Sequence, residues 1–305
     1  MKEFYPEGKL IGTPENEKNL SSKEKINAAF LGEKILEAVV TMCDTGHNLI
    51  VNLGVMKGII PRNEGAIGIA EGETRDMALI SRVGKPVCFV ITGFKEDERG
   101  RTYALLSRRK AQEMCRRFYL SKLNKGDIIN ARITHLESFG AFCDIGCGNA
   151  ALLPIDFISV SRISHPKDRF SVGDNIRVAV KCIENGKITL TLKELLGTWE
   201  ENASLFSAGQ TVTGVIRSIE EYGVFVELTA NLAGLAEPRN DVYIGSKACV
   251  YIKSINPEKM KIKLVIIDSF DNNEKSELNY FYTGDKIKEF NYSPSRAYKQ
   301  ITSFF

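Results

Sequence analysis

The sequence predicts a mainly β protein built from three consecutive five-stranded barrels joined by short helical linkers. Two observations lead to this prediction. Residues 126–145 and 209–228 match each other without a gap at a spacing of 83 residues, and the segments that follow them also correspond. Each repeat consists of short runs of alternating β-branched residues bounded by Gly, Asn and Asp, a pattern typical of strands joined by tight turns. Closing five such strands into a barrel removes the exposed sheet edges.

The repeat defines three units along the chain. Its most distinctive element is Phe139-Gly140-Ala141-Phe142, which returns as Tyr222-Gly223-Val224-Phe225. A weaker copy upstream keeps the order of strand-like segments but lacks this aromatic element, so we expect a degenerate first barrel. The five-stranded Greek-key barrel that binds oligonucleotides, the OB-fold, fits each unit. The predicted barrels occupy residues 29–105, 126–193 and 209–268.

The segments outside the barrels differ in composition. Residues 1–28 are polar, and we expect a flexible or loosely attached leader. Residues 106–125 contain seven Lys and Arg against one Glu at helical spacing, which predicts a basic linker helix. Residues 194–208 form a second, acidic linker that we expect the single Trp, Trp199, to anchor. Residues 269–305 are too aromatic for an ordinary disordered tail, so we expect this extension to dock on a barrel or on a partner.

Composition and motifs exclude several classes of protein. The 305 residues include 41 Lys and Arg against 38 Asp and Glu, and 43% are hydrophobic, which argues against a disordered polyelectrolyte. No apolar run approaches the ~20 residues of a membrane helix, and the start of the chain does not resemble a signal peptide, so we expect a cytoplasmic protein without membrane contact. The seven cysteines include no CxxC pair, so no metal is expected. Phosphate-loop, HExxH and GxSxG motifs are absent, so the sequence predicts no enzyme, cofactor or small-molecule substrate.

The aromatic element is the strongest functional signal. Residues three apart on a strand point to opposite faces, so Phe139 and Phe142 can share a surface only if Gly140 marks a turn or bulge. Such a pair would stack unpaired bases, and nearby cations would neutralise the backbone. The alternative is that one ring of each pair caps the barrel core. The candidate stacking residues and their cations are Phe139, Phe142, Tyr222, Phe225, Lys187 and Lys261.

Two basic segments are further candidates for phosphate contact. One is the loop before the fourth strand of the second barrel, which contains Arg162, Lys167 and Arg169; the alternative is a solvated loop. The other is the linker helix, where like charges would repel each other unless a polyanion lies nearby. The alternative there is a solvated helix face. The candidates on this helix are Arg108, Arg109, Arg116 and Arg117.

These motifs resemble a known family. The aromatic element, followed in order by Ala151-Leu152-Leu153-Pro154, Val172-Gly173-Asp174 and Gly186-Lys187-Ile188, is similar to the RNA-binding repeat of the bacterial small-subunit ribosomal protein S-one. The third unit resembles the same repeat and the first its degenerate amino-terminal copies, as in the shorter clostridial homologues. The resemblance covers roughly residues 30–268. It implies OB-fold barrels that bind single-stranded RNA, and a first barrel that contacts protein, often the ribosome.

The chain also departs from the family pattern. The family His at the end of the third strand is replaced by Pro154 and Glu237, and Lys187 and Lys261 stand where the family has Arg. These changes favour stacking plus charge over hydrogen bonding to base edges. The resulting hypothesis is a protein that holds single-stranded mRNA at the small ribosomal subunit during translation. Two alternatives remain open: an RNA-binding regulator or RNA-decay accessory that acts away from the ribosome, and a scaffold that binds other proteins. The sequence does not distinguish RNA from single-stranded DNA.

Overall fold

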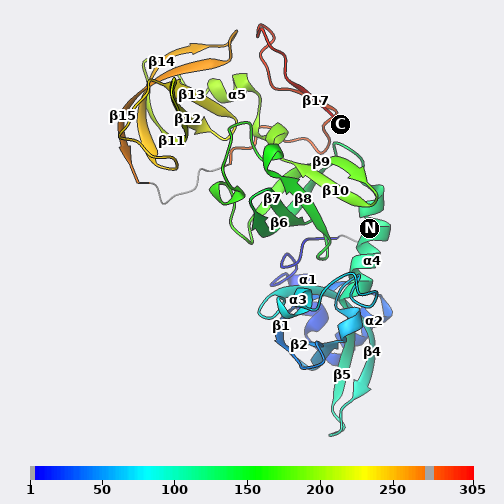
Figure 1. Ribbon diagram of the computed structural model, residues 1–305. Helices are drawn as coiled ribbons and strands as arrows, with labels where there is room; N and C mark the ends of the chain where they lie inside the picture. The colour runs from blue at the N-terminus through cyan, green and yellow to red at the C-terminus, as the bar shows by residue number, and fades with distance from the viewer. Residues whose placement is uncertain (1–3, 272–277) are drawn as a thin grey trace. The chain divides into compact units, whose positions relative to one another are not determined.

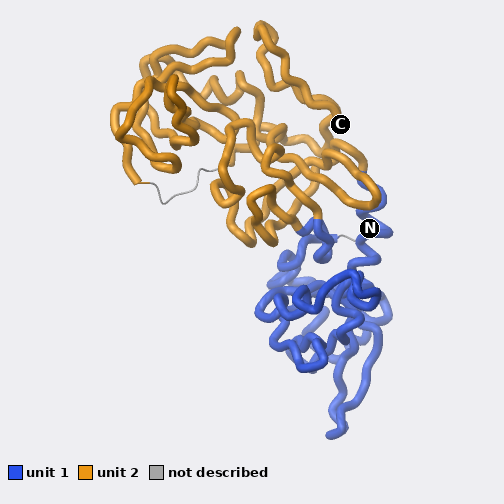
Figure 2. The backbone as a smooth tube through the Cα atoms, in the orientation of Figure 1, with its two compact units in different colours: residues 1–123, 144–150 blue, residues 124–143, 151–305 orange. Residues whose placement is uncertain are grey.

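The computed structural model describes residues 4–271 and 278–305 (Figure 1). It contains three closed five-stranded barrels in sequence, which confirms the predicted fold class. The chain divides into two compact units, one of residues 1–123 and 144–150 and one of residues 124–143 and 151–305 (Figure 2). In the described ranges no helix combines the length and the apolar character that a bilayer span requires.

The first barrel has the strand order β1-β2-β3-β5-β4. A bulge between Val40 and Met42 interrupts the pairing of β1 with β2, and such bulges bend a strand so that the sheet can close. Four short helical elements accompany the strands. The elements are β1 (Leu36–Cys43), β2 (Leu49–Asn52), β3 (Lys57–Ile60), η1 (Arg62–Glu64), α3 (Met77–Ile80), β4 (Pro86–Glu96) and β5 (Thr102–Ser107), preceded by α1 (Pro14–Leu20) and α2 (Lys23–Leu31).

The amino-terminal segment is not the loosely attached leader that its polar composition predicts. It forms the helices α1 and α2, which begin at the capping side chains of Thr13 and Ser22. In α2, Ile26 is completely buried and belongs to the core of the first barrel. Composition misled here because a short helix needs only one or two apolar residues on its inner face to dock.

The first linker forms α4 (Arg108–Phe118) and the short η2 (Leu120–Lys122). The hydroxyl of Ser107 accepts a hydrogen bond from the Lys110 N–H at 2.8 Å and caps α4. Ala111 and Cys115 are fully buried on the inner face of the helix. The linker is therefore helical, and one face of the helix packs against other buried side chains.

The second barrel has the strand order β10-β8-β7-β6-β9. Residues 144–150, between β7 and β8, belong to the first unit, and the rest of the barrel belongs to the second. Two 3-10 turns lie between β8 and β9. The elements are β6 (Ile128–Glu137), β7 (Gly140–Asp144), β8 (Ala150–Pro154), η3 (Ile155–Phe157), η4 (Pro166–Asp168), β9 (Asn175–Glu184) and β10 (Lys187–Thr191).

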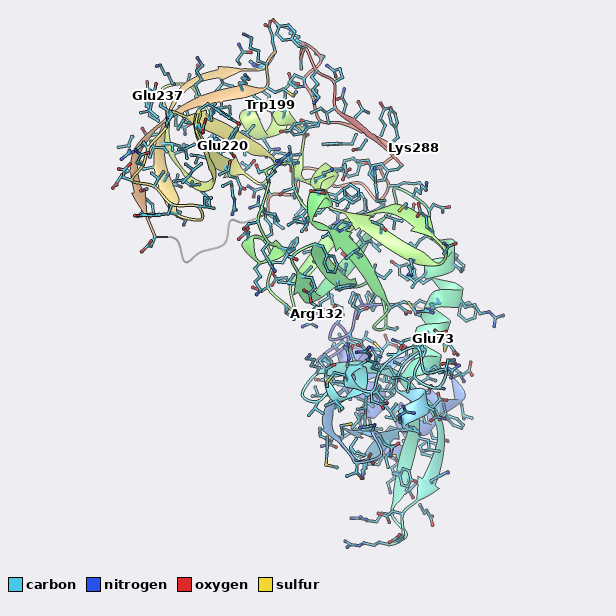
Figure 3. All side chains as sticks on the ribbon, viewed as in Figure 1. Glu73, Arg132, Trp199, Glu220, Glu237 and Lys288 are labelled. Atoms are coloured by element: carbon cyan, nitrogen blue, oxygen red, sulfur yellow. The ribbon has the colours of Figure 1, made fainter. Side chains whose placement is uncertain are left out.

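The second linker and the third barrel form one packed body. The linker helix carries Trp199, which is 3% exposed and lies in the core of the third barrel, as the sequence predicts (Figure 3). The strand order β11-β12-β13-β15-β14 repeats that of the first barrel. The elements are η5 (Lys193–Leu196), α5 (Trp199–Ala203), β11 (Thr211–Glu220), β12 (Gly223–Thr229), β13 (Leu232–Ala236), β14 (Lys247–Asn256) and β15 (Lys261–Phe270).

The carboxy-terminal extension docks on both barrels of the second unit. It contains the hairpin of β16 (Glu289–Asn291) and β17 (Thr302–Phe304). Tyr292 joins the core of the third barrel, and its hydroxyl donates to the Asn231 carbonyl at 2.6 Å. On the second barrel, the Ile287 N–H donates to the Gly126 carbonyl at 2.8 Å. The stretch 272–277, also part of the predicted extension, lies outside the described residues.

A first prediction concerns α2. Replacing Ile26 by Ala is expected to destabilise the first unit by about 2–5 kcal/mol, because it leaves a cavity in the barrel core. Leu31, 74% exposed on the same helix, is the matched control, and Leu31→Ala should stay within about 0.5 kcal/mol of wild type. Differential scanning calorimetry measures both; equal effects of the two substitutions would show that α2 does not contribute to the core.

Two buried carboxyl groups lie in the same unit. Burial is the main cause that raises the pKa of Asp144 to about 7, and the nearby Glu7 carboxylate raises it further. Burial also raises the pKa of Glu37. Asp144 accepts hydrogen bonds from the Glu7 N–H at 2.6 Å and the Gly146 N–H at 2.8 Å. Desolvation thus outweighs these bonds, which favour the ionised form.

The second prediction follows from these carboxyl groups. Because their pKa values are raised on folding, the folded state holds more protons than the unfolded chain, and the stability of the first unit falls as pH rises from about 4 to about 7. The calorimetric transition that Ile26→Ala lowers should therefore move down over that range. Asp144→Asn, which removes the titrating group, should reduce this dependence; a transition that instead moves up with pH in wild type would contradict the assignment.

Candidate nucleic-acid interface

The second barrel presents an aromatic pair on its surface. Phe139 lies in the turn between β6 and β7, and Phe142 lies in β7. The ring centroids are 6.0 Å apart and the rings are perpendicular, at 90°. Phe139 is 54% exposed. The turn before Gly140 therefore brings both rings onto one surface, as the sequence analysis required of a stacking site.

The third barrel repeats this arrangement. Tyr222, in the turn before β12, and Phe225, in β12, have ring centroids 6.1 Å apart at an angle of 88°. Tyr222 is 66% exposed. A buried ring that caps a core would not stay this accessible in both copies. The outer ring of each pair is thus a surface residue, and the inner ring, half-buried, is its perpendicular neighbour.

The glycine between the rings allows two strands to approach closely. A Cβ atom on Gly140 would lie 2.6 Å from the Leu153 carbonyl oxygen and 3.0 Å from the Pro154 Cα. A Cβ on Gly223 would collide with the Ala236 oxygen at the equivalent place. Only glycine fits where the backbones come this near. The motif spacing is therefore a consequence of strand packing as well as of surface chemistry.

Strand register places cations beside the aromatic pair of the third barrel. Phe225 lies opposite Leu235 in β13, and Leu235 lies opposite Lys263 in β15. Lys261, which the sequence singled out, is exposed two residues earlier on the same face of β15. Sequence reasoning missed Lys263 because its counterpart in the second barrel is Thr189. The alternation of Lys261, Ile262 and Lys263 could have indicated it, because residues two apart on a strand lie on the same face.

The second barrel has a different neighbour for its inner ring. His135 in β6 lies with its ring centroid 6.4 Å from that of Phe142, and its Nε2 is 2.7 Å from Glu137 Oε1. Its position in the third repeat is taken by Ser218, which lies opposite Phe225. Lys187 is exposed at the start of β10. His135 was not predicted from the sequence, because its place beside the ring depends on the pairing of β6 with β7.

The predicted basic loop of the second barrel divides into exposed and buried cations. Arg162 and Lys167 are exposed. Arg169 is 3% exposed, so its assignment to phosphate contact is wrong. Its guanidinium donates to Glu227 Oε1 at 2.7 Å and to the Ser159 hydroxyl at 3.3 Å. Charge clustering in the sequence could not reveal this, because the partner lies 58 residues away.

Glu227 is the centre of a buried ion cluster within the second unit. It is 2% exposed, and it also accepts from Arg217 Nε at 2.8 Å. Neighbouring backbone contacts join the same two barrels: the Ser161 N–H donates to the Ala230 carbonyl at 3.0 Å, and the Val160 N–H donates to Asn231 Oδ1 at 3.0 Å. The loop of the second barrel is thus fixed to the third barrel.

The arginines of the linker helix α4 are likewise partly buried and partly exposed. Arg108 is 3% exposed and forms two hydrogen bonds to the Glu7 carboxylate, at 2.6 and 2.9 Å, so its assignment to phosphate contact is also wrong. Arg109 is half-buried and pairs with Glu71 and Glu113. Arg116 and Arg117 are exposed, although Arg116 donates to Asn149 Oδ1 at 2.8 Å. The repulsion that suggested a polyanion is therefore relieved in part by carboxylates of the protein itself.

In the first barrel the equivalent surface lacks an aromatic pair. His47, the nearest substitute, adopts a left-handed backbone conformation with φ of 59°, and its Nδ1 is 3.5 Å from Asp76 Oδ2. Across the described residues, no group of three or more His, Cys, Asp and Glu side chains is placed to hold a metal ion. The candidate interface is thus confined to the second and third barrels.

Comparison with known proteins finds a family match for the second barrel. Residues 122–193 match the family described as S1 RNA binding domain. The chain is 30% identical over 178 residues to small ribosomal subunit protein bS1 of Leuconostoc lactis, covering 52% of this chain and 41% of that protein. It is 25% identical over 295 residues to the bS1 homologue of Bacillus cereus, covering 88% and 74%. These matches confirm the resemblance to the S-one family that the motifs indicate.

Three further similarities define the extent of the match. The chain is 26% identical to bS1 of Streptococcus pneumoniae over 81% of its length and 65% of that protein, so it spans about two fifths to two thirds of these first two relatives. Among solved structures, the solution structure of GSP13 from Bacillus subtilis is 26% identical with a TM-score of 0.23, covering 24% of this chain and 57% of that one. A Streptococcus pneumoniae multidomain protein with nucleic acid binding domains is 13% identical with a TM-score of 0.25, covering 79% and 76%.

The third prediction concerns the buried ion cluster. Arg169→Met should destabilise the second unit by on the order of 3 kcal/mol, because it removes one partner of a buried carboxylate. The exposed Arg162→Met is the control and should change stability by less than about 0.5 kcal/mol. Urea unfolding followed by fluorescence of Trp199 measures both, since this residue is buried in the third barrel. A stability loss for Arg162→Met as large as that for Arg169→Met would contradict the assignment.

Proposed function

We propose that this protein binds single-stranded RNA, mRNA above all, through its second and third barrels, and that it acts in translation in the cytoplasm by holding mRNA at the small ribosomal subunit. The observation that carries the proposal is the repeated aromatic pair, with the same perpendicular geometry at 6.0 and 6.1 Å. The match of residues 122–193 to the S1 RNA binding domain supports it.

Binding would combine stacking with charge neutralisation. An exposed ring such as Phe139 or Tyr222 offers a π-face to an unpaired base, and each such contact contributes roughly 1–3 kcal/mol. Lys187 and Lys261 lie at the matching starts of β10 and β15, and Lys263 lies two residues further along β15. All three would pair with phosphates. Because each pairing releases counterions, affinity should fall steeply with salt.

The two barrels would act on one strand. They belong to the same compact unit, and the cluster around Glu227 ties the loop of one to the strand β12 that carries Phe225. Once one barrel is occupied, the second therefore meets the same RNA at a raised effective concentration. Modest affinity per barrel would suffice for firm binding of a longer strand.

The role at the ribosome has separate support. The first barrel lacks the aromatic pair, which leaves its surface for contacts other than base stacking. The names of the curated relatives are those of small ribosomal subunit proteins rather than of enzymes. Sedimentation of tagged protein on sucrose gradients tests the assignment: co-migration with the small subunit supports it, whereas migration only in light fractions would favour the regulator or decay role.

The fourth prediction tests RNA binding directly. Phe142→Ala combined with Phe225→Ala should weaken binding of a labelled single-stranded RNA by at least about ten-fold, because two stacking contacts are lost, while the dependence of affinity on salt stays similar. Fluorescence anisotropy over a salt series, with duplex RNA as a second ligand, measures this.

The control for this experiment is Phe304→Ala. Phe304 is 69% exposed on the carboxy-terminal hairpin and belongs to neither aromatic pair, so its replacement should leave affinity unchanged. If the double variant is folded and binds as tightly as wild type, the rings are core or protein-contact residues. If wild type binds no single-stranded nucleic acid, the scaffold alternative replaces the proposal.

A further inference from the structure

The outer face of β14 and β15 in the third barrel is exposed and mixed in character. Alternate residues of β15 from Lys261 to Ile267 point outward and are exposed. On β14, Tyr251 lies opposite Val265 and is 40% exposed. An aromatic ring on an accessible strand face, next to lysines, has the composition of a single-stranded nucleic-acid platform.

The same face of the second barrel is covered. There, the Ile128 N–H donates to the Asp285 carbonyl at 2.9 Å, which places the carboxy-terminal extension along β6. Lys181 Nζ lies 4.4 Å from the centroid of the Phe305 ring. Lys181 Nζ also donates to the Phe304 carbonyl at 3.1 Å, so the end of β17 lies beside β9 (Figure 1). This face of the repeat is thus able to hold an extended chain and an aromatic ring.

In the third barrel the equivalent residues are open. The repeat aligns Lys253 with Lys181 and Tyr251 with Ala179. The strand register agrees with this alignment. Ile128 of the second barrel pairs with Ala179, and the equivalent Thr211 of the third barrel pairs with Tyr251. Lys253 is exposed. The extension reaches this hairpin at its turn, where the Tyr298 N–H donates to the Glu258 carbonyl at 3.0 Å. A large aromatic residue therefore stands uncovered where the second barrel has a small, buried one.

Charge favours a polyanion as the occupant. Residues 247–270 contain five lysines against two carboxylates, Glu258 and Asp268. Among the described residues, no ion pair is found for Lys253, Lys261 or Lys263. A strand of RNA offers both parts of the match, because its phosphates pair with the lysines and its bases stack on the ring.

The face is continuous with the candidate interface. From Phe225 the row runs through Leu235 in β13 to Lys263 in β15, and Tyr251 lies on the next strand. By way of β13 and β15, three strand spacings separate β12 from β14, about 14 Å around the barrel. An OB-fold binds roughly 4–16 nucleotides, whereas one aromatic pair holds two bases, so a longer strand needs further contacts.

We propose that Tyr251 is an additional base-stacking residue of the third barrel, and that RNA leaving Phe225 crosses β13 and β15 to reach it, with its phosphates on Lys263 and Lys253. The inference rests on the proposed function, because it extends the path of the same ligand. It assigns a role to a face whose counterpart in the second barrel is covered by the extension.

The fifth prediction tests this path with two RNA lengths. For a single strand of about twelve nucleotides, Tyr251→Ala should weaken binding by roughly five-fold or more, and for one of about four nucleotides it should have no effect, since the short strand is held by the aromatic pair alone. Tyr251→Phe keeps the ring and is the matched control, with affinity unchanged at both lengths. Lys253→Gln should lower the salt dependence for the longer strand only.

The outcomes separate the inference from the function on which it rests. If Phe225→Ala weakens both lengths while Tyr251→Ala weakens neither, the RNA does not cross to β14 and the inference fails although the function stands. If wild type binds neither strand, both fail. If a peptide of residues 278–305 binds the intact chain in a Tyr251-dependent manner and RNA binding does not depend on Tyr251, the face belongs to the extension of a second copy, and the inference is overturned.

Discussion

The acid at the end of the second strand of each full repeat is the constraint on which the packing inside each compact unit depends. Asp144 and Glu227 occupy equivalent positions, 83 residues apart, and both are nearly inaccessible to solvent. Each is buried against a segment that precedes its own barrel: Asp144 accepts from the Glu7 N–H, and Glu227 accepts from Arg169. Removing a donor would leave a buried carboxylate without compensation for its charge, so each of these acids requires its hydrogen-bond partners.

This constraint explains which arginines are available for RNA. In the sequence, Arg108 and Arg169 are indistinguishable from their basic neighbours, yet the first is bound to Glu7 and the second to Glu227. Their neighbours Arg117 and Lys167 stay exposed. The cations that organise the fold are therefore removed from the interface, and the charge that remains for phosphates comes mainly from lysines on strand faces.

The features predicted from sequence were those that local patterns control. Strand alternation and the repeat predicted three barrels, and the glycine within Phe139-Gly140-Ala141-Phe142 predicted the turn that brings both rings to one surface. The features missed depend on pairing across the chain. Lys263 joins Phe225 only through the register of β12, β13 and β15. The helices of the amino-terminal segment escaped detection because α2 places only two residues, Ile26 and Ala29, among the buried residues of the barrel core.

The residues at the interface determine what kind of selectivity it can have. Lysine is a compact point charge without the planar fork that reads a base edge, and Pro154 offers no side-chain donor at the end of β8. Stacking accepts any base whose face is free, but a base inside a duplex has no free face. In the proposed function, recognition built from Phe139, Tyr222 and strand-face lysines would therefore discriminate unpaired strands from duplexes and tolerate many sequences. A protein that must hold many different messages needs this combination, because a preference for one base would exclude most of them.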